Sequence, residues 1–354
     1  MKTKTITLHD TDNFGSSLQA YALQRFLLDN NVENELIDYL PKYLYNHGKS
    51  TFIFARNILF FRDVRKKNER FKKFKKDHLN VTHDTYQTLE DLKQGNLSAD
   101  VFLCGSDQLW NSNYLCGKDP AYYLNFLDNK DSKKVSYAVS LGKSDVPESE
   151  LNWISENAKD FSKISVREES SSISLEKKLN KPVTVVCDPV FLLDKNRYFD
   201  IAAERIEEKP YAFLYLIEPS ETLEKTIKYL REEKKLKIIV AGSYRKKSSA
   251  DVNLRDLGPS EFLSLLIHAD FILASSFHAV AFSLLLEKRF SAILPHKNQE
   301  RIKHILGLIG LEDRIIDENS DISQCYCMPE YNKLSNKLSE FIDFSKKWLL
   351  DSLK

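Results

Sequence analysis

The sequence lacks an excess of either charge, because 52 lysines and arginines stand against 51 aspartates and glutamates. No overall field therefore attracts a polyanion, and we expect no nucleic-acid partner. Glycine and proline are also few, with 10 of each, while 42% of the residues are hydrophobic. This composition excludes fibrous and disordered proteins and indicates a globular one. At 354 residues the chain exceeds the length at which one core usually stops growing, so we expect two domains.

Cysteine and long apolar runs are scarce as well. The five cysteines are odd in number and scattered, which favours reduced thiols in the cytoplasm over a disulfide framework. Cys325 and Cys327 have no second Cys or His pair at ligand spacing nearby, so we expect no metal site. The first residues lack the apolar run of a secretory signal, and the longest apolar tract, 271–286, is interrupted by three serines and a histidine. We therefore expect a cytoplasmic protein that does not span a membrane.

Strand-like and helix-like segments alternate along the chain. The expected strands of the first half are 5–8, 36–39, 99–104, 135–140, 164–167 and 183–187, with a helix at 16–28. The pattern restarts after residue 194, with expected strands at 211–217, 237–241, 271–274 and 290–294. This alternation predicts an α/β fold of two Rossmann-like lobes with parallel sheets that face a cleft. We place the lobes at 1–195 and 196–331, followed by a closing helix within 332–354.

Polar side chains follow several of these strands directly, where open α/β sheets bind their ligands. The loop 9–15 contains Asn13 and Gly15, and Gly15 permits close approach of the backbone to a ligand. A plain turn with an asparagine at the start of a helix explains the same residues. Gly142 ends another strand and is a weaker candidate for placing backbone N–H groups near an anion.

The loop 105–111 is the densest of these connections, with a hydroxyl, a carboxylate, two amides and an indole. Capping of a helix by the hydroxyl and the carboxylate explains part of this composition. The candidate substrate-binding residues of the loop are Ser106, Gln108, Trp110 and Asn111, and Asp107 is a candidate catalytic residue.

Arg167 and His278 carry groups that suit an anionic ligand. Arg167 ends an apolar strand, where a guanidinium can hold a carboxylate or phosphate with two hydrogen bonds. An ion pair with Glu168, Glu169 or another carboxylate of the chain is the alternative. His278 follows the step Ser275-Ser276 near the start of a helix, where the backbone and the helix dipole attract anions.

The loops resemble the polysaccharide pyruvyl transferase family in the order and spacing of their motifs. The matching segments are NFGSSLQAYALQ (13–24), GSDQLWN (105–111), SYAVSLG (136–142), SVREESS (165–171), CDPVFLL (187–193) and SSFHAVAFSLLLEKRF (275–290). The resemblance implies a fold similar to glycosyltransferase-B enzymes, phosphoenolpyruvate as donor, a pair of sugar hydroxyls as acceptor, and no cofactor. It also implies that Arg167 binds the donor and that His278 is the catalytic or donor-contacting histidine. We expect the acceptor in the first lobe and the donor in the second.

One position departs from the family pattern. Many relatives have an Arg-Leu-His triplet where this chain has Ser276, Phe277 and His278, so an arginine is absent. Another cation must then balance the donor, whose phosphate and carboxylate together carry roughly two to three negative charges. We expect Arg301 to serve, with Lys297 and Arg245 as alternatives.

Ketal formation requires a proton on the methylene carbon of phosphoenolpyruvate, and we expect His278 to deliver it. Arg167 would orient the donor and stabilise charge on the departing phosphate. The base that accepts the hydroxyl proton is either Asp107 or Asp12, and no metal is needed. The alternative functions are a nucleotide-sugar-dependent glycosyltransferase of the same fold and a scaffold that only binds polysaccharide.

A basic segment at 62–76 holds nine basic and two acidic residues and follows an apolar stretch, 52–61. We place it in the first lobe. Phenylalanines 60, 61, 71 and 74 are interleaved with the cations, an arrangement that fits a peripheral contact with anionic lipid and a lipid-linked sugar acceptor. A solvated helix that packs its phenylalanines on the lobe is the alternative.

Overall fold

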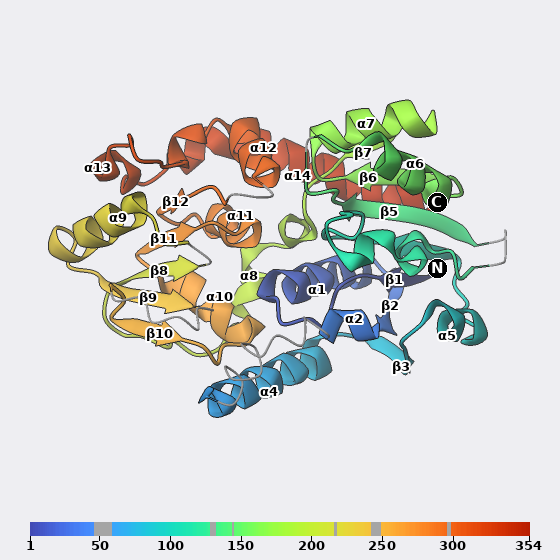
Figure 1. The fold of residues 1–354 in the computed structure, drawn as a ribbon, viewed down its shortest axis with the longest axis horizontal. Helices are drawn as coiled ribbons and strands as arrows, with labels where there is room; N and C mark the ends of the chain where they lie inside the picture. Colours follow the sequence, from blue (N-terminus) through green and yellow to red (C-terminus); the bar gives the residue numbers. More distant parts are fainter. Residues whose placement is uncertain (46–58, 128–131, 144, 216–217, 242–248, 296–298) are drawn as a thin grey trace. The chain divides into compact units, whose positions relative to one another are not determined.

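Two compact units, each built around a parallel β-sheet, make up the structure, which is a computed structural model (Figure 1). It describes residues 1–45, 59–127, 132–143, 145–215, 218–241, 249–295 and 299–354. The first unit comprises Met1–Gly48, Lys75–Leu193 and Ser339–Lys354, and the second comprises Lys49–Phe74 and Asp194–Leu338.

The sheet of the first unit has seven strands in the order β3-β2-β1-β4-β5-β6-β7. The strands are β1 (Lys2–Ile6), β2 (Glu33–Tyr39), β3 (Val81–Tyr86), β4 (Val101–Cys104), β5 (Lys133–Val139), β6 (Lys163–Val166) and β7 (Val183–Val185). The helices of this unit are α1 (Phe14–Asp29), α2 (Lys42–Tyr45), α5 (Leu89–Gln94), η1 (Leu115–Lys118), η2 (Pro120–Tyr123), α6 (Glu148–Ala158), α7 (Glu169–Leu179) and η3 (Pro189–Leu192). Each adjacent pair of strands is parallel, and Ile6 at the end of β1 lies opposite Cys104 at the end of β4.

The second unit has a parallel sheet of five strands in the order β10-β9-β8-β11-β12. The strands are β8 (Tyr211–Tyr215), β9 (Lys237–Ala241), β10 (Val252–Leu254), β11 (Phe271–Ala274) and β12 (Phe290–Ala292). The helices are α8 (Lys195–Phe199), α9 (Glu221–Glu232), α10 (Pro259–His268), α11 (Phe277–Leu285), α12 (Glu300–Ile309), η4 (Glu312–Arg314) and α13 (Ile322–Cys325). Two helices contain residues of both units, α4 (Phe61–His78) and α14 (Tyr331–Leu353).

Burial explains why the central strands form. Strands β4, β8 and β11 are buried at every residue, as expected for parallel strands covered on both faces. Each unit has its own cluster of buried apolar side chains. The α/β fold with two parallel sheets, predicted from the alternation, is therefore confirmed.

Helix α1 is buried along almost its whole length, so its polar side chains need internal partners. Gln19 has such partners in the loops at the carboxyl ends of β1 and β4. Its amide nitrogen donates to Thr7 Oγ1 at 2.9 Å, and its amide oxygen accepts from the backbone N–H of Ser106 at 3.1 Å. One side chain thus ties the loop after β1 to the loop after β4.

Two strands were absent from the sequence analysis. Strand β3 (VTHDTY) exposes three consecutive polar residues, and strand β10 has three half-buried residues. Both are edge strands, where one side of the strand needs no partner and the apolar pattern weakens. Neither segment therefore shows the apolar run that identified the central strands.

The units differ from the expected lobes at the basic segment and at the closing helix. Residues 62–74 belong to the second unit, whereas we had placed 62–76 in the first lobe. The physical reason is that Arg70 forms ion pairs with Asp256 at 3.1 Å and Glu261 at 3.0 Å. The helix expected within 332–354 is α14, and its residues from Ser339 onward belong to the first unit.

A buried carboxylate, Asp38 at the end of β2, joins three elements of the first unit. Its Oδ1 accepts from Lys75 Nζ at 2.6 Å and lies 2.9 Å from His9 Nε2, and its Oδ2 accepts from Thr85 at 2.7 Å. Burial acts to raise the pKa of Asp38, but the hydrogen bonds from His9 and Lys75 outweigh it and hold this pKa well below its usual value. The ionised carboxylate therefore stabilises the fold.

We expect Asp38→Asn to lower the free energy of unfolding by about 2 kcal/mol at pH 7, because charge-assisted hydrogen bonds are lost. A carboxylate with a depressed pKa stabilises above its unfolded pKa, so the difference from the native chain should shrink as the pH falls below about 4. Urea unfolding between pH 3 and pH 7 measures this. Asp84→Asn, at an exposed carboxylate, is the control, and an equal loss in both variants would contradict the account.

Candidate active site

A pocket of about 540 Å³ lies in the first unit where the strand order reverses. Strands β1 and β4 are neighbours, but the chain proceeds from them toward opposite edges of the sheet. Their outgoing loops therefore separate and leave a crevice at the carboxyl ends of the strands, the usual ligand site of such sheets. The residues that line the pocket are Leu8, Thr11, Asp12, Asn13, Ser16, Tyr43, Leu44, Asp107, Gln108, Asn113, Tyr114, Leu115 and Cys116.

The loop after β1 supplies one wall. Asn13 caps helix α1, and its Oδ1 accepts from the backbone N–H groups of Gly15 at 2.9 Å and Ser16 at 3.3 Å. The alternative of an asparagine that starts the helix is thus correct for Asn13, and the same residue also lines the pocket. Gly15 is a buried residue of the first turn of α1 and does not line it. Asp12 lies exposed beside Asn13.

Asp107, in the loop after β4, is held in the pocket by several hydrogen bonds. Its Oδ2 accepts from Ser16 Oγ at 2.6 Å, and its Oδ1 accepts from the backbone N–H of Gln108 at 2.8 Å. Its φ of 86° is one that few residues other than glycine adopt. The backbone carbonyl accepts from Leu109 at 2.8 Å and Ser140 at 3.0 Å, which holds the residue in this conformation.

Arg167 lies behind Asp107 and is buried, with 2% of its side chain exposed. Its guanidinium donates to Asp188 and, at 3.4 Å, to Asp107 Oδ1. Burial favours the neutral form, but the carboxylates, chiefly Asp188 and Asp107, outweigh it and raise the pKa of Arg167. The alternative of an intramolecular ion pair is therefore what the structure shows, although the partners are not Glu168 or Glu169.

The loop after β5 supports Gln108 and Asn111 from behind. Asn111 Nδ2 donates to Gln108 Oε1 at 2.7 Å, and a Cβ on Gly142 would lie 2.2 Å from that nitrogen. Gly142 also has a φ of 72°, so only glycine fits without strain. The Gly142 N–H donates to Ser140 Oγ at 3.1 Å. The absence of a side chain at Gly142 thus leaves room for the amides of Asn111 and Gln108. Gly142 itself does not line the pocket.

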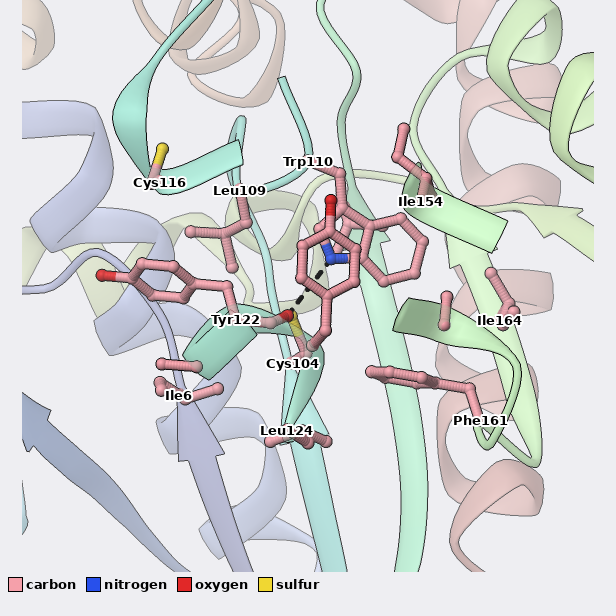
Figure 2. Packing of buried hydrophobic residues seen from close by; sticks show 14 of the residues in the cluster. Ile6, Cys104, Leu109, Trp110, Cys116, Tyr122, Leu124, Ile154, Phe161 and Ile164 are labelled. Atoms are coloured by element: carbon pink, nitrogen blue, oxygen red, sulfur yellow. Dashed lines mark hydrogen bonds between the residues drawn. The ribbon is translucent and has the colours of Figure 1, made fainter. Parts of the chain in front are cut away.

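Trp110 and Ser106, predicted to bind substrate, are buried in the interior of the first unit. The Trp110 side chain is 1% exposed, stacks on Tyr123 at 5.2 Å and meets Phe161 edge-on at 5.6 Å. Figure 2 shows its indole nitrogen directed at the carbonyl oxygen of Tyr122, a hydrogen bond of 3.2 Å. Ser106 is fully buried and donates from its hydroxyl to the carbonyl of Ala138 at 2.7 Å. Neither side chain lines the pocket.

Tyr43 and Cys116 line the pocket in their neutral forms. The Tyr43 hydroxyl donates to Asp119 at 2.5 Å, and burial together with the nearby Asp119 carboxylate raises the pKa of Tyr43. Burial also raises the pKa of the Cys116 thiol to about 12, so the thiol is no nucleophile at neutral pH. The ring of Tyr43 is thereby fixed as an apolar surface with its hydroxyl already engaged.

Sequence reasoning missed Ser16, Tyr43, Asn113 and Asp188. Asp188 had a usable signal, because it follows β7 and precedes a proline, and its Oδ1 caps η3 through Val190 N at 3.0 Å. Ser16 lies within the first matching motif but was taken as part of the helix. Tyr43 and Asn113 had no signal, since the sheet topology alone brings them to the pocket.

The second unit holds the other predicted residues. His278 is the second residue of α11, is buried, and has its ring centre 5.4 Å from that of Phe277. Ser275 and Ser276 precede the helix, and Ser276 is its N-cap residue. The Arg301 guanidinium lies 5.4 Å from the ring centre of Phe277, so this cation lies next to the ring that contacts His278. The alternatives Lys297 and Arg245 lie outside the described residues.

The loops described above lie within a match to a known protein family. The pattern of the polysaccharide pyruvyl transferase family matches residues 13–297, which includes both sets of loops. The chain belongs to this family. Membership makes it a transferase of polysaccharide biosynthesis and implies a polysaccharide acceptor. No curated protein sequence matches the chain.

The fold of this family member is like that of GT-B glycosyltransferases and related epimerases. The UDP-GlcNAc 2-epimerase of Methanocaldococcus jannaschii has a TM-score of 0.55 at 12% identity, with 99% of this chain and 98% of that chain covered. The enzyme of Neisseria meningitidis, bound to UDP-GlcNAc, has a TM-score of 0.54 at 13% identity, covering 100% and 99%. An alpha-glucosyltransferase in complex with UDP and DNA has a TM-score of 0.55 at 10% identity, covering 100% and 99%. At such low identities the likeness concerns the fold alone.

None of the helices in the described ranges is long and apolar enough to cross a membrane. Within the same ranges, no group of three or more His, Cys, Asp or Glu side chains is arranged to hold a metal ion.

Proposed function

We propose that this transferase moves the pyruvate of phosphoenolpyruvate onto two hydroxyls of one sugar as a ketal, with release of phosphate. The observation that carries the proposal is the family match over residues 13–297, which contains Asp107, Arg167 and His278. The geometry of each unit supports a separate part of the reaction.

The pocket of the first unit suits the acceptor sugar. Its polar lining of carboxylates, amides and hydroxyls can accept and donate hydrogen bonds to sugar hydroxyls. Tyr43 and the half-exposed Tyr114 offer ring faces to the apolar C–H face of a sugar. Behind the pocket, Arg167 faces Asp107 and Asp188, so its charge is already balanced by carboxylates and does not favour a phosphate there.

The start of α11 in the second unit suits the anionic donor. The first N–H groups of a helix have no partner within the helix and carry partial positive charge. His278 lies in this first turn. The guanidinium of Arg301 lies over the ring of Phe277, the residue that precedes His278. Arg301 therefore remains our proposed replacement for the arginine that this chain lacks.

Asp107 is our proposed base for the acceptor hydroxyl, because it lines the pocket and three hydrogen bonds fix its direction. Arg167 is then a positioning residue, which holds Asp107 through one guanidinium nitrogen and Asp188 through another. This role replaces the direct contact with the donor that the resemblance implied.

The proposed reaction balances without a metal or a redox partner. His278 protonates the methylene carbon of phosphoenolpyruvate, which becomes the methyl group, and the neighbouring carbon becomes electrophilic. One sugar hydroxyl attacks this carbon and gives its proton to Asp107. A second hydroxyl of the same sugar attacks as the carbon–oxygen bond to phosphate breaks, and its proton leaves with the phosphate.

Ligand-induced stabilisation tests the donor, since a ligand of the native state raises the melting temperature. We expect phosphoenolpyruvate to raise it and UDP-sugars to leave it unchanged. His278→Gln and Arg301→Met should reduce the shift, while Lys225→Gln on the exposed face of α9 should preserve it. Stabilisation by a UDP-sugar and none by phosphoenolpyruvate would favour the nucleotide-sugar glycosyltransferase instead.

A further inference from the structure

Helix α4 is rich in basic residues, and one of its faces is buried whereas the other is exposed. It runs over Phe61–His78 and includes the basic segment 62–76. Phe71 and Phe74 are buried on one face, and most of the charged residues lie on the other. The earlier alternative, a helix that packs its phenylalanines inward, is therefore correct for these two residues.

The cations near the buried face are neutralised by specific carboxylates. Arg70 pairs with Asp256 and Glu261, as described above, and Lys66 pairs with Asp256 at 2.7 Å. Lys75 pairs with Asp10 at 2.8 Å and with Asp38. These cations hold the helix in place, so their charge is accounted for by the fold.

The exposed face carries a stripe of charged residues, mostly cations, some of which have no ion-pair partner among the described residues. The exposed residues of the stripe are Arg62, Arg65, Lys66, Glu69, Lys72, Lys73 and Lys76. Their spacing of three and four residues places them on one side of the helix. Glu69 is the acidic member, and it pairs with Arg65 at 3.3 Å. Among the described residues, no carboxylate lies within ion-pair distance of Arg62, Lys72 or Lys76.

Two large apolar side chains are exposed where this stripe begins. Leu59 is 75% exposed and Phe61 is 62% exposed. The neighbouring Phe60 differs, because the guanidinium of Arg255 lies over its ring at 4.6 Å. Exposed apolar residues beside a row of cations are the pattern of surfaces that bind the headgroup region of a bilayer.

We infer that the stripe of α4, with Leu59 and Phe61, is a docking surface for an anionic lipid membrane. The cations face the lipid phosphates, and the two apolar side chains enter the boundary between headgroups and acyl chains. A nucleic acid is the other polyanion that such a row attracts, but the net charge of +1 gives the chain no general affinity for one. The inference is independent of the proposed reaction and places the transferase on a surface where lipid-carried saccharides are accessible.

Flotation with lipid vesicles at low salt tests this surface. We expect the intact chain to float with vesicles of mixed phosphatidylcholine and phosphatidylglycerol, and not with phosphatidylcholine alone. Binding should fall as salt is added, because salt screens exposed charges. Arg62→Gln, Lys72→Gln and Lys76→Gln combined should weaken binding about 100-fold, since each cation at an anionic surface contributes roughly five-fold.

A matched control removes three exposed lysines elsewhere, as Lys177→Gln, Lys225→Gln and Lys228→Gln combined, and should bind like the native chain. Leu59→Ser with Phe61→Ser should weaken binding at both low and moderate salt, because its contribution is not electrostatic. Circular dichroism checks that each variant is folded. Absence of flotation at low salt, an equal loss in both triple variants, or retention by RNA without flotation would each overturn the inference.

Discussion

Asp107→Asn should lower kcat for pyruvyl transfer by about 100- to 10,000-fold, the range expected when a positioned general base is removed. The amide keeps the size of the carboxylate. Its oxygen can still accept from the N–H of Gln108, and its NH2 group can donate to Ser16 Oγ, which accepts in place of donating. The pocket should therefore keep its shape, and KM for the sugar should change little. Steady-state phosphate release, with the acceptor concentration varied, separates kcat from KM.

Asp12 provides the matched control for Asp107. It lines the same pocket but is exposed, and we assign it no proton transfer. Asp12→Asn should change KM more than kcat and lower kcat less than about 10-fold, since the proposed base Asp107 is left in place. A larger fall in kcat for Asp12→Asn than for Asp107→Asn would assign the base to Asp12.

Arg167→Met should lower the free energy of unfolding by about 3 to 5 kcal/mol, because it leaves two buried carboxylates without their cation. Asp107 and Asp188 are 6% and 2% exposed, so water cannot replace the guanidinium. The double variant of Arg167→Met with Asp188→Asn should be less destabilised than the sum of the two single variants, because it removes one uncompensated charge. Chemical denaturation of the native chain, the two single variants and the double variant measures this coupling.

Arg25→Met is the control for Arg167. Arg25 pairs with Asp29 at 2.5 Å, but 40% of its side chain is exposed, and exposed pairs contribute about 0 to 1 kcal/mol. If both arginine variants lost the same stability, Arg167 would not be the centre of a buried network. A positioning role also makes a prediction for Arg167→Lys, which keeps the charge. This variant should retain a larger share of the native stability than of the native kcat, since an ammonium cannot span both carboxylates.

The sequence predicted those parts of the molecule that local pattern determines. Strands β9 and β11 were predicted at their observed bounds, because KIIVA and FILA are short apolar runs between polar loops. The position of Asp107 and His278 directly after strands followed from the same pattern. The edge strands β3 and β10 escaped because their exposed residues interrupt that pattern.

The contacts of the candidate site depend on residues far apart in the chain, which the sequence does not reveal. Arg167 meets Asp107 from 60 residues away and Asp188 from 21 residues away, so its ion pairs were recognisable only as an open alternative. Trp110 was expected in the pocket because its loop is polar. Its indole lies instead between Tyr123 and Phe161, and that packing is decided by the tertiary fold.

The most direct test of the account is phosphate release from phosphoenolpyruvate by the purified chain, with and without a panel of galactosides, glucosides and mannosides. Mass analysis of the sugar products should accompany it. The account predicts that release depends on an acceptor, that a pyruvate ketal of that acceptor is formed, and that both are lost in folded His278→Gln. No phosphate release with any acceptor, together with consumption of a UDP-sugar, would contradict the proposed donor.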